Sequence, residues 1–534
     1  MNAARATLLA LAAALASPAA ALVAVDAAPA ATEAEAEIRD AAWLDRQIGA
    51  VVDHYALPGI AVGVIEDGRI THVHTSGERV VDSGQPVTPA TLFKIASNSK
   101  AMTASLLARL VDAGKLAWDD PVTRHLPQFR MHDPWVTAHM QVRDLLIHNS
   151  GLPEGAGDLM LWPEPNDFGR ADIINGLAHL KPERSFRSGY AYDNLLYVVA
   201  GEVAAAAGGD GYEALVRREV FEPLGLSRCQ VGEFDRDAVG DIAQPHMRQE
   251  GRHVAYALDP STVPAITSAA AGGIRCSVED MLTWALAWLR PESAPGWLSH
   301  AQREAMWTAH TPLPVGDRDR LWRNTHLRAY GYGWRLADAH GLASVSHTGT
   351  LGGMYSVLHL LPERNAGFVV LINGSGAAAR TVLDQVLLDY LAGAGAGREA
   401  GDYIAELSPE RGTTAAQQPA PDVSARQPAT PEAMAGWLGH WRDPWFGEVR
   451  LCPDGNTVRF QSAKSPRLAG VVMEVAGGRL VDWDADSVDA EAWISLDASE
   501  APPTLRMAKV DPQADFSYDY EDLAFTRAGG CKPD

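Results

Sequence analysis

Strand-prone segments occur in two groups, one around residues 60–76 and one over residues 330–372. A long stretch that favours helix separates them, which limits the folds that the chain can adopt. The first group flanks Glu66-Asp67-Gly68, and Asp-Gly between two apolar runs indicates a hairpin. The second comprises residues 330–336, 343–347, 354–361 and 367–372. Residues 118–330 between them favour helix and loop. We therefore predict an α+β domain, with one antiparallel sheet flanked by helices and a helical insert.

The composition changes after this domain, which we place at residues 38–393. Residues 394–430 are rich in Ala, Gly, Pro, Gln and Thr, a composition typical of a linker. Residues 431–534 then contain many short β-prone runs. The sequence thus predicts a second, C-terminal domain that is an all-β barrel or sandwich.

Residues 1–21 have the pattern of a secretory signal peptide. Arg5 precedes an apolar run over residues 6–16, and small residues follow at a cleavage site near Ala21 or, alternatively, near Ala28. The run is too short to span a membrane, and no later stretch is long enough. Residues 22–37 are rich in Ala and Glu and are predicted to be disordered. We expect an exported protein, periplasmic or secreted, without a membrane span.

The cysteines fit such an environment. Two fall in each predicted domain: Cys229 and Cys276 in the first, Cys452 and Cys531 in the second. The simplest pairing is therefore within each domain. No C-x-x-C or H-x-x-x-H spacing indicates a metal site, so neither a metal nor a cofactor is predicted.

The net charge of −22 excludes one class of partner. There are 67 acidic against 45 basic residues, and no basic stretch that would neutralise phosphates. We therefore expect no nucleic-acid partner but a small-molecule or peptide substrate. The oligomeric state stays open.

Ser97-x-x-Lys100 precedes an amphipathic helix predicted over residues 101–113. A serine hydroxyl becomes a good nucleophile when a base takes its proton. Lysine can be that base only when neutral, which at pH 7 requires its pKa to fall by roughly three units. Alone, this pattern more often marks a helix cap and a surface charge. The remaining motifs decide between the two interpretations.

Two further patterns follow in order: Tyr192-Asp193-Asn194 before a predicted helix, and His347-Thr348-Gly349 at the end of a predicted strand. With Ser97-x-x-Lys100, this order resembles the serine β-lactamase-like hydrolases, which include class C β-lactamases, DD-carboxypeptidases, D-aminopeptidases and esterases. Residues 145–153, 271–274 and 330–334 are also similar to that family. The resemblance covers roughly residues 38–393.

The resemblance implies a role for each motif residue. Ser97 would be the nucleophile, Lys100 its activating partner, and Tyr192 the base for acylation or the acid for the leaving group. Asn194 would bind the substrate amide and Lys100. The backbone N–H groups of Ser97 and Thr350 would form the oxyanion hole. His347, Thr348, Gly349 and Thr350 would bind substrate.

His347 departs from class C β-lactamases, which carry lysine there. An imidazole is only partly charged at pH 7, which weakens an anchor for the β-lactam carboxylate. A protonated His347 would nevertheless lower the pKa of Tyr192. We therefore expect an acyl-serine hydrolase of D-amino-acid-type peptides or amides. Alternatives are a carboxylesterase, a weak β-lactamase, or a penicillin-binding sensor or scaffold without turnover.

The C-terminal region resembles the lipocalin-like domain that some of these hydrolases carry. Its tryptophans are typical of a barrel core. The alternative is that the domain shapes or covers the active-site cleft.

Overall fold

The predicted hairpin between Ile60 and Ser76 forms the first two strands of the central sheet in the computed structural model. The model describes residues 39–408, 420–484, 488, 490–497, 499 and 502–531. The predicted signal peptide and disordered segment lie outside these residues. Asp67 and Gly68 both have positive φ, 49° and 70°, as a two-residue hairpin turn requires. This turn confirms the hairpin prediction.

The central sheet has eight strands in the order β2-β1-β14-β13-β12-β11-β10-β9. Its strands are β1 (Gly59–Glu66), β2 (Arg69–Gly77), β9 (Thr311–Pro312), β10 (Arg328–Tyr330), β11 (Arg335–Ala339), β12 (Leu342–Leu351), β13 (Met354–Leu361) and β14 (Ala366–Ile372). Strand β1 pairs antiparallel with β14, so that Ile60 lies opposite Ile372. The two distant strand groups thus meet in one sheet, as the sequence predicts.

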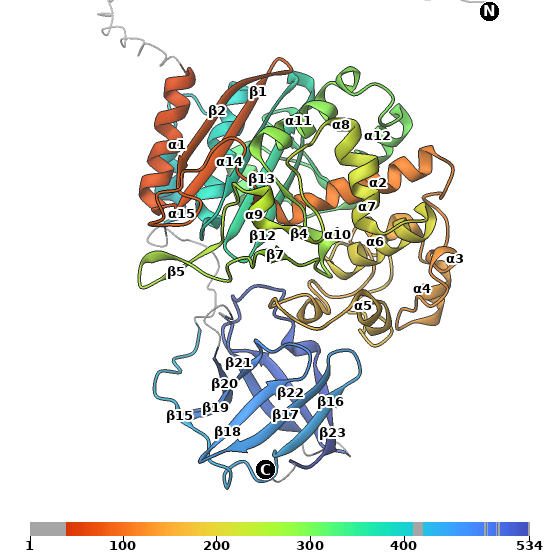
Figure 1. The fold of residues 1–534 in the computed structure, drawn as a ribbon, viewed down its shortest axis with the longest axis vertical. Coiled ribbons are helices and arrows are strands. Elements are labelled where there is room, and N and C mark those ends of the chain that lie inside the picture. The colour runs from red at the N-terminus through yellow and green to blue at the C-terminus, as the bar shows by residue number, and fades with distance from the viewer. Residues whose placement is uncertain are drawn as a thin grey trace, which may run out of the picture. The chain divides into compact units, whose positions relative to one another are not determined.

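Helices cover both faces of this sheet (Figure 1). On one face, α1 (Ala41–Tyr55), α14 (Ala377–Ala392) and α15 (Ala400–Leu407) bury apolar residues against β1 and β14. On the other, α2 (Ser99–Asp112), α6 (Leu195–Gly208) and α11 (Val278–Leu289) contribute to a second core. These layers confirm the α+β prediction. Helix α15 lies within the predicted linker, so residues 400–407 belong to the folded domain instead.

The helical insert also contains short strands that the sequence did not indicate. Its further helices are α3 (Val122–His125), α4 (Pro134–His139), α5 (Arg170–Gly176), α7 (Tyr212–Val216), α8 (Glu222–Leu224), α9 (Arg236–Val239), α10 (Ala269–Gly272), α12 (His300–Met306) and α13 (Asp317–Arg323). Three two-stranded pairs accompany them: β3 (Phe93–Lys94) with β8 (Arg275–Cys276), β4 (Phe234–Asp235) with β7 (Thr262–Val263), and β5 (His246–Gln249) with β6 (Arg252–Ala255). Strands of two to four residues leave little periodicity to detect.

The C-terminal domain is a closed eight-stranded antiparallel barrel, which confirms the predicted β architecture. Its strands are β16 (Gly439–Asp443), β17 (Gly447–Asp454), β18 (Thr457–Ser462), β19 (Ala469–Val475), β20 (Gly478–Trp483), β21 (Ala492–Asp497), β22 (Thr504–Lys509) and β23 (Ala524–Gly529). Pairing between β19 and β20 closes the barrel, and the short β15 (Gln427–Pro428) adds to β19. Cys452 and Cys531 form a disulfide that joins β17 to the end of the described chain.

Residues 39–534 belong to one compact unit, so the barrel and the hydrolase-like domain contact each other directly. None of the helices in the described residues is both long and apolar enough to cross a bilayer.

Candidate active site

Ser97 lies in a tight turn rather than at the cap of a helix. Residues 96–98 form a 3-10 turn, and α2 begins at Ser99 without a side-chain cap. Ala96 has a φ of 48°, a conformation that costs an L-residue roughly 1 kcal/mol. The side chain of Ser97 reaches a cavity of about 490 Å³ and is only partly buried. The turn therefore presents the hydroxyl to a substrate.

Lys100 lies one turn along, with its Nζ 3.0 Å from Ser97 Oγ. The ammonium also donates to Asn194 Oδ1 at 2.7 Å and to the carbonyl oxygen of Ala271 at 2.9 Å. Burial, together with the nearby Arg335 and against an opposing effect of Asp158, lowers the pKa of Lys100 to about 7. A neutral amine has two hydrogens, which the two carbonyl oxygens accept. Its lone pair then points at the Ser97 hydroxyl.

Tyr192 completes the contacts of the serine from the other side. Its hydroxyl donates to Ser97 Oγ at 2.8 Å. Burial raises the pKa of Tyr192 well above its ordinary value, although Arg335 opposes the shift. The phenol is therefore protonated at neutral pH. Of the two implied roles for Tyr192, this favours a proton donor over a base.

Asn194 positions the lysine through its side-chain amide, which bonds Lys100 at one end and Asp158 at the other. It precedes α6, and its Nδ2 donates to Asp158 Oδ2 at 2.8 Å. That bond orients the amide so that Oδ1 faces Lys100. Burial raises the pKa of Asp158 well above its usual range, which weakens this carboxyl as a counter-ion for Lys100.

Strand β12 brings the third motif beside the serine turn. Thr348 and Thr350 line the same cavity as Ser97. Gly349 lies directly against the turn, because a Cβ there would collide with the carbonyl oxygen of Ile95. Glycine at this position therefore permits the close approach of β12 to the nucleophile.

This geometry can now be set beside known proteins. Residues 44–392, more than half of the chain, match the family model described as Beta-lactamase. The chain belongs to the β-lactamase family.

Relatives within this family carry hydrolase, penicillin-binding and esterase names. This chain is 28% identical over 362 residues to unguisins hydrolase ungD′ of Aspergillus campestris, and the match covers 65% of each chain. It is 28% identical to penicillin-binding protein 4 of Amycolatopsis lactamdurans, covering 66% of this chain and 90% of that protein. It is 31% identical to esterase EstB of Burkholderia gladioli, covering 62% and 91%. The protein is therefore a serine hydrolase of the β-lactamase, penicillin-binding and esterase type.

A solved structure has a similar fold. The octameric penicillin-binding protein homologue from Pyrococcus abyssi superposes with a TM-score of 0.57 at 20% identity, covering 91% of the hydrolase and 100% of that chain. This similarity concerns the fold. The chain spans less than two thirds of the length of ungD′.

His347 does not have the charge or the orientation that its resemblance to the family lysine implies. It is fully buried, with Nε2 2.8 Å from the Tyr330 hydroxyl and Nδ1 2.7 Å from the carbonyl oxygen of Thr348. Burial, with Arg335 and Lys100 nearby, holds the pKa of His347 well below its usual range. A neutral His347 is no cationic neighbour of Tyr192. Since side chains alternate along β12, Thr348 faces the cavity and His347 does not line it.

Two arginines, rather than His347, place positive charge beside the third motif in a cavity that Lys94, Glu154, Glu164 and Asp515 also line. Arg335 on β11 donates to Thr348 Oγ1 at 2.7 Å and lies 6.0 Å from the Tyr192 ring centroid. Arg380 on α14 donates to the carbonyl oxygen of Gly349 and to Thr350 Oγ1 at 2.6 and 2.9 Å. Both line the cavity. The sequence held one signal for Arg335, because it directly follows the family-like stretch 330–334.

A loop of the barrel reaches the same cavity. Phe516 lies edge-on to Tyr192, with ring centroids 5.8 Å apart. Ser517 Oγ donates to Asp158 Oδ2 at 2.8 Å, and Asp519 accepts from the backbone N–H groups of Gly157 and Leu159 at 2.6 and 3.0 Å. Residues 515–518 are therefore part of the cavity wall. No local pattern distinguishes them from any other barrel loop.

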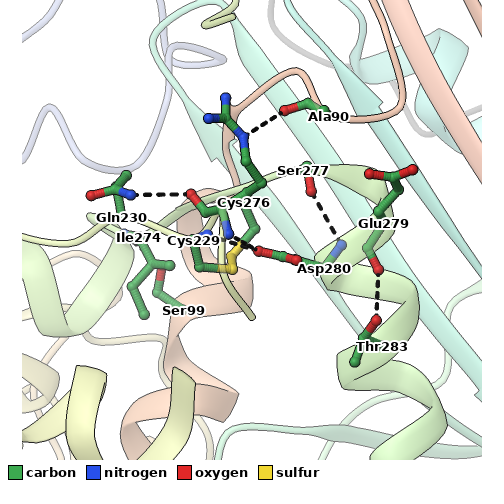
Figure 2. Close-up of a disulfide and its surroundings, with 11 residues drawn as sticks. Ala90, Ser99, Cys229, Gln230, Ile274, Cys276, Ser277, Glu279, Asp280 and Thr283 are labelled. Atoms are coloured by element: carbon green, nitrogen blue, oxygen red, sulfur yellow. Dashed lines mark hydrogen bonds between the residues drawn. A yellow bond between two sulfur atoms is a disulfide. The ribbon is translucent and has the colours of Figure 1, made fainter. Parts of the chain in front are cut away.

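Figure 2 shows the disulfide between Cys229 and Cys276, close to Ile274 and Ser99. Cys276 belongs to β8, which pairs with β3, and Ile274 donates its N–H to Ser99 Oγ at 3.1 Å. Asp280 accepts from the N–H groups of Arg228 and Cys229 at 2.7 and 2.8 Å. These contacts anchor the segment that carries the Ala271 carbonyl to the start of α2.

Proposed function

We propose that the protein is an exported hydrolase that cleaves amides or esters through an acyl-serine intermediate on Ser97. One observation carries this mechanism: both hydrogens of a neutral Lys100 amine have carbonyl acceptors, which leaves its lone pair for the Ser97 proton. Tyr192 would donate its proton to the leaving group and recover one from the Lys100 ammonium, which holds the serine proton, and the N–H groups of Ser97 and Thr350 would stabilise the oxyanion. Its two disulfides support the proposed export.

The cavity charges support a substrate with a carboxylate. Arg335 and Arg380 line the cavity and donate to Thr348 Oγ1 and Thr350 Oγ1. A guanidinium binds a carboxylate through two parallel hydrogen bonds. We therefore favour peptides or amides of D-amino acids that end in a carboxylate. Simple esters are the second candidate, because one relative is named esterase EstB.

A turnover screen tests this proposal. We expect release of the terminal residue from D-Ala-D-Ala peptides to exceed hydrolysis of p-nitrophenyl esters and of nitrocefin at equal concentration. A fluorescent penicillin should label the protein and be released over time. Labelling without release, and no turnover of any substrate, would instead indicate the sensor or scaffold.

Arg335→Gln should separate charged from neutral substrates. We expect acylation by benzylpenicillin to slow by about 10- to 100-fold, since a charge-assisted hydrogen bond contributes about 1.5–3 kcal/mol. Acylation by an uncharged p-nitrophenyl ester should change much less. Stopped-flow acylation rates measure both, with the exposed Arg130→Gln variant as the control. Equal losses for the two substrates would show that Arg335 only maintains the site.

Ser517→Ala tests the contribution of the barrel loop. The variant removes one of the hydrogen bonds to Asp158 Oδ2, which holds Asn194 and through it Lys100. We expect kcat to fall about fivefold, because one hydrogen bond contributes about 1 kcal/mol, while KM for a small ester stays constant. Ser495→Ala, on an exposed position of β21, is the matched control. An unchanged kcat would show that the barrel loop lines the cavity without supporting the catalytic residues.

A further inference from the structure

Two histidines and an aspartate converge on the surface between α1 and β2. His72 and His74 are alternate residues of β2 and so share a face of the strand. Asp45 on α1 faces them, with its Oδ1 3.0 Å from His72 Nε2 and 2.8 Å from His74 Nδ1. One donor atom from each residue lies within 4.8 Å of the others.

The protein satisfies these imidazoles only in part: His74 Nδ1 shares a hydrogen bond with Asp45 Oδ1 at 2.8 Å, a contact that a metal ion would replace. Among the residues that the structure describes, Nε2 of His72 and Nε2 of His74 are buried and have no hydrogen-bond partner. The short contact from His72 to Asp45 therefore lacks the geometry of a hydrogen bond. A buried imidazole nitrogen without a partner leaves a lone pair available as a metal ligand.

We propose that Asp45, His72 and His74 bind a zinc ion. Tetrahedral Zn²⁺ with ligands at about 2.1 Å separates its donor atoms by about 3.4 Å, so a small side-chain adjustment opens the observed contacts enough. Two imidazoles and one carboxylate suit zinc, whereas Mg²⁺ and Ca²⁺ prefer oxygen ligands alone. The Asp45 side chain is 50% exposed, which leaves a coordination position open for water.

The position of the cluster indicates a structural role. Strand β2 is an edge of the central sheet, whereas Ser97 lies beside β12, four strand positions away in the order β2-β1-β14-β13-β12. At about 4.8 Å per strand this is about 19 Å, too far for the ion to touch a substrate at Ser97. The ion would instead join the first helix to the edge strand. The sequence pattern alone does not indicate the cluster, because His-x-His on a strand is a metal site only when a third ligand comes from another element, here Asp45 on α1.

The test uses the full chain without an affinity tag, after dialysis against a chelator. Calorimetric titration with Zn²⁺ should show saturable binding of a single equivalent, and saturating Zn²⁺ should raise Tm by a few degrees because it binds only the folded state. His72→Ala, His74→Ala and the more exposed Asp45→Asn should each weaken binding at least tenfold. His300→Ala should bind as the wild type does, since His300 is an exposed histidine that pairs with Glu304 away from the cluster.

Several outcomes would overturn the proposal. Wild-type protein that binds no zinc saturably would do so, as would cluster variants that bind zinc with wild-type affinity. The hydrolysis rate should be the same with and without the ion. A rate that falls on chelation and returns with Zn²⁺ would contradict the structural role.

Discussion

Ser97→Ala is expected to abolish turnover while the protein stays folded. The hydroxyl is the group that both Lys100 and Tyr192 contact, at 3.0 and 2.8 Å, and no other side chain takes its place. Loss of the nucleophile should reduce kcat by at least about 10⁴-fold, as in other enzymes in which the nucleophile acts with its base as a unit. Ser97 caps no helix, so its removal should change Tm by only a degree or two.

The measurement is hydrolysis by wild type and variant, together with thermal unfolding and mass spectrometry after incubation with a penicillin. Wild type should gain the mass of the acyl group, and the variant should not. Ser293→Ala, at the exposed start of the loop after α11, controls for the loss of a serine hydroxyl. Residual acylation of the variant at another residue would show that the nucleophile is misassigned.

Lys100→Met is expected to have the second largest effect. Methionine fills a similar volume but has no amine, so general-base assistance of about 10²- to 10⁴-fold should be lost. The pKa of about 7 sets the pH dependence in the wild type. Only the neutral amine accepts the serine proton, so acylation should rise as pH increases through 7 and level off above 8.

Acylation rates from pH 5 to 9 measure this rise, which forms the acidic limb of the pH profile. The variant should show a low, flat profile, and the exposed Lys115→Met variant should keep the wild-type shape. His347→Gln should also keep the limb, because the pKa of the buried His347 lies well below this range. A limb that persists in Lys100→Met and disappears in His347→Gln would assign it to the imidazole after all.

The sequence predicts those parts of the fold that depend on neighbouring residues, such as hairpin turns and apolar strands. Asp67-Gly68 adopts the positive φ values that its sequence favours, and the apolar runs of β13 and β14 lie on both sides of a turn at residues 362–365. The first two motifs lie at the starts of α2 and α6, but His347-Thr348-Gly349 lies within β12, which runs two residues beyond the motif instead of ending at it. Ser97, Lys100, Tyr192 and Asn194 are all within hydrogen-bond reach of a neighbour in the set.

The remaining site residues depend on contacts between distant elements. Whether His347 or Thr348 faces the cavity is set by the packing of β12 on the serine turn, which the sequence of the strand does not specify. Arg335 enters the site from a neighbouring strand, and Ser517 from a different domain. The protonation state of His347 follows from burial, and burial is a property of the folded molecule.

The reach of the barrel loop has a consequence for the order of events during synthesis. Ser517 and Asp519 hold Asp158 and its neighbours, yet Ser517 is synthesised 359 residues after Asp158. A growing chain that has already folded its serine, lysine and tyrosine would still lack this support. Hydrolytic activity should therefore mature late, once the C-terminal barrel has closed, and a chain truncated before β22 should be a poor catalyst even where its first domain is folded.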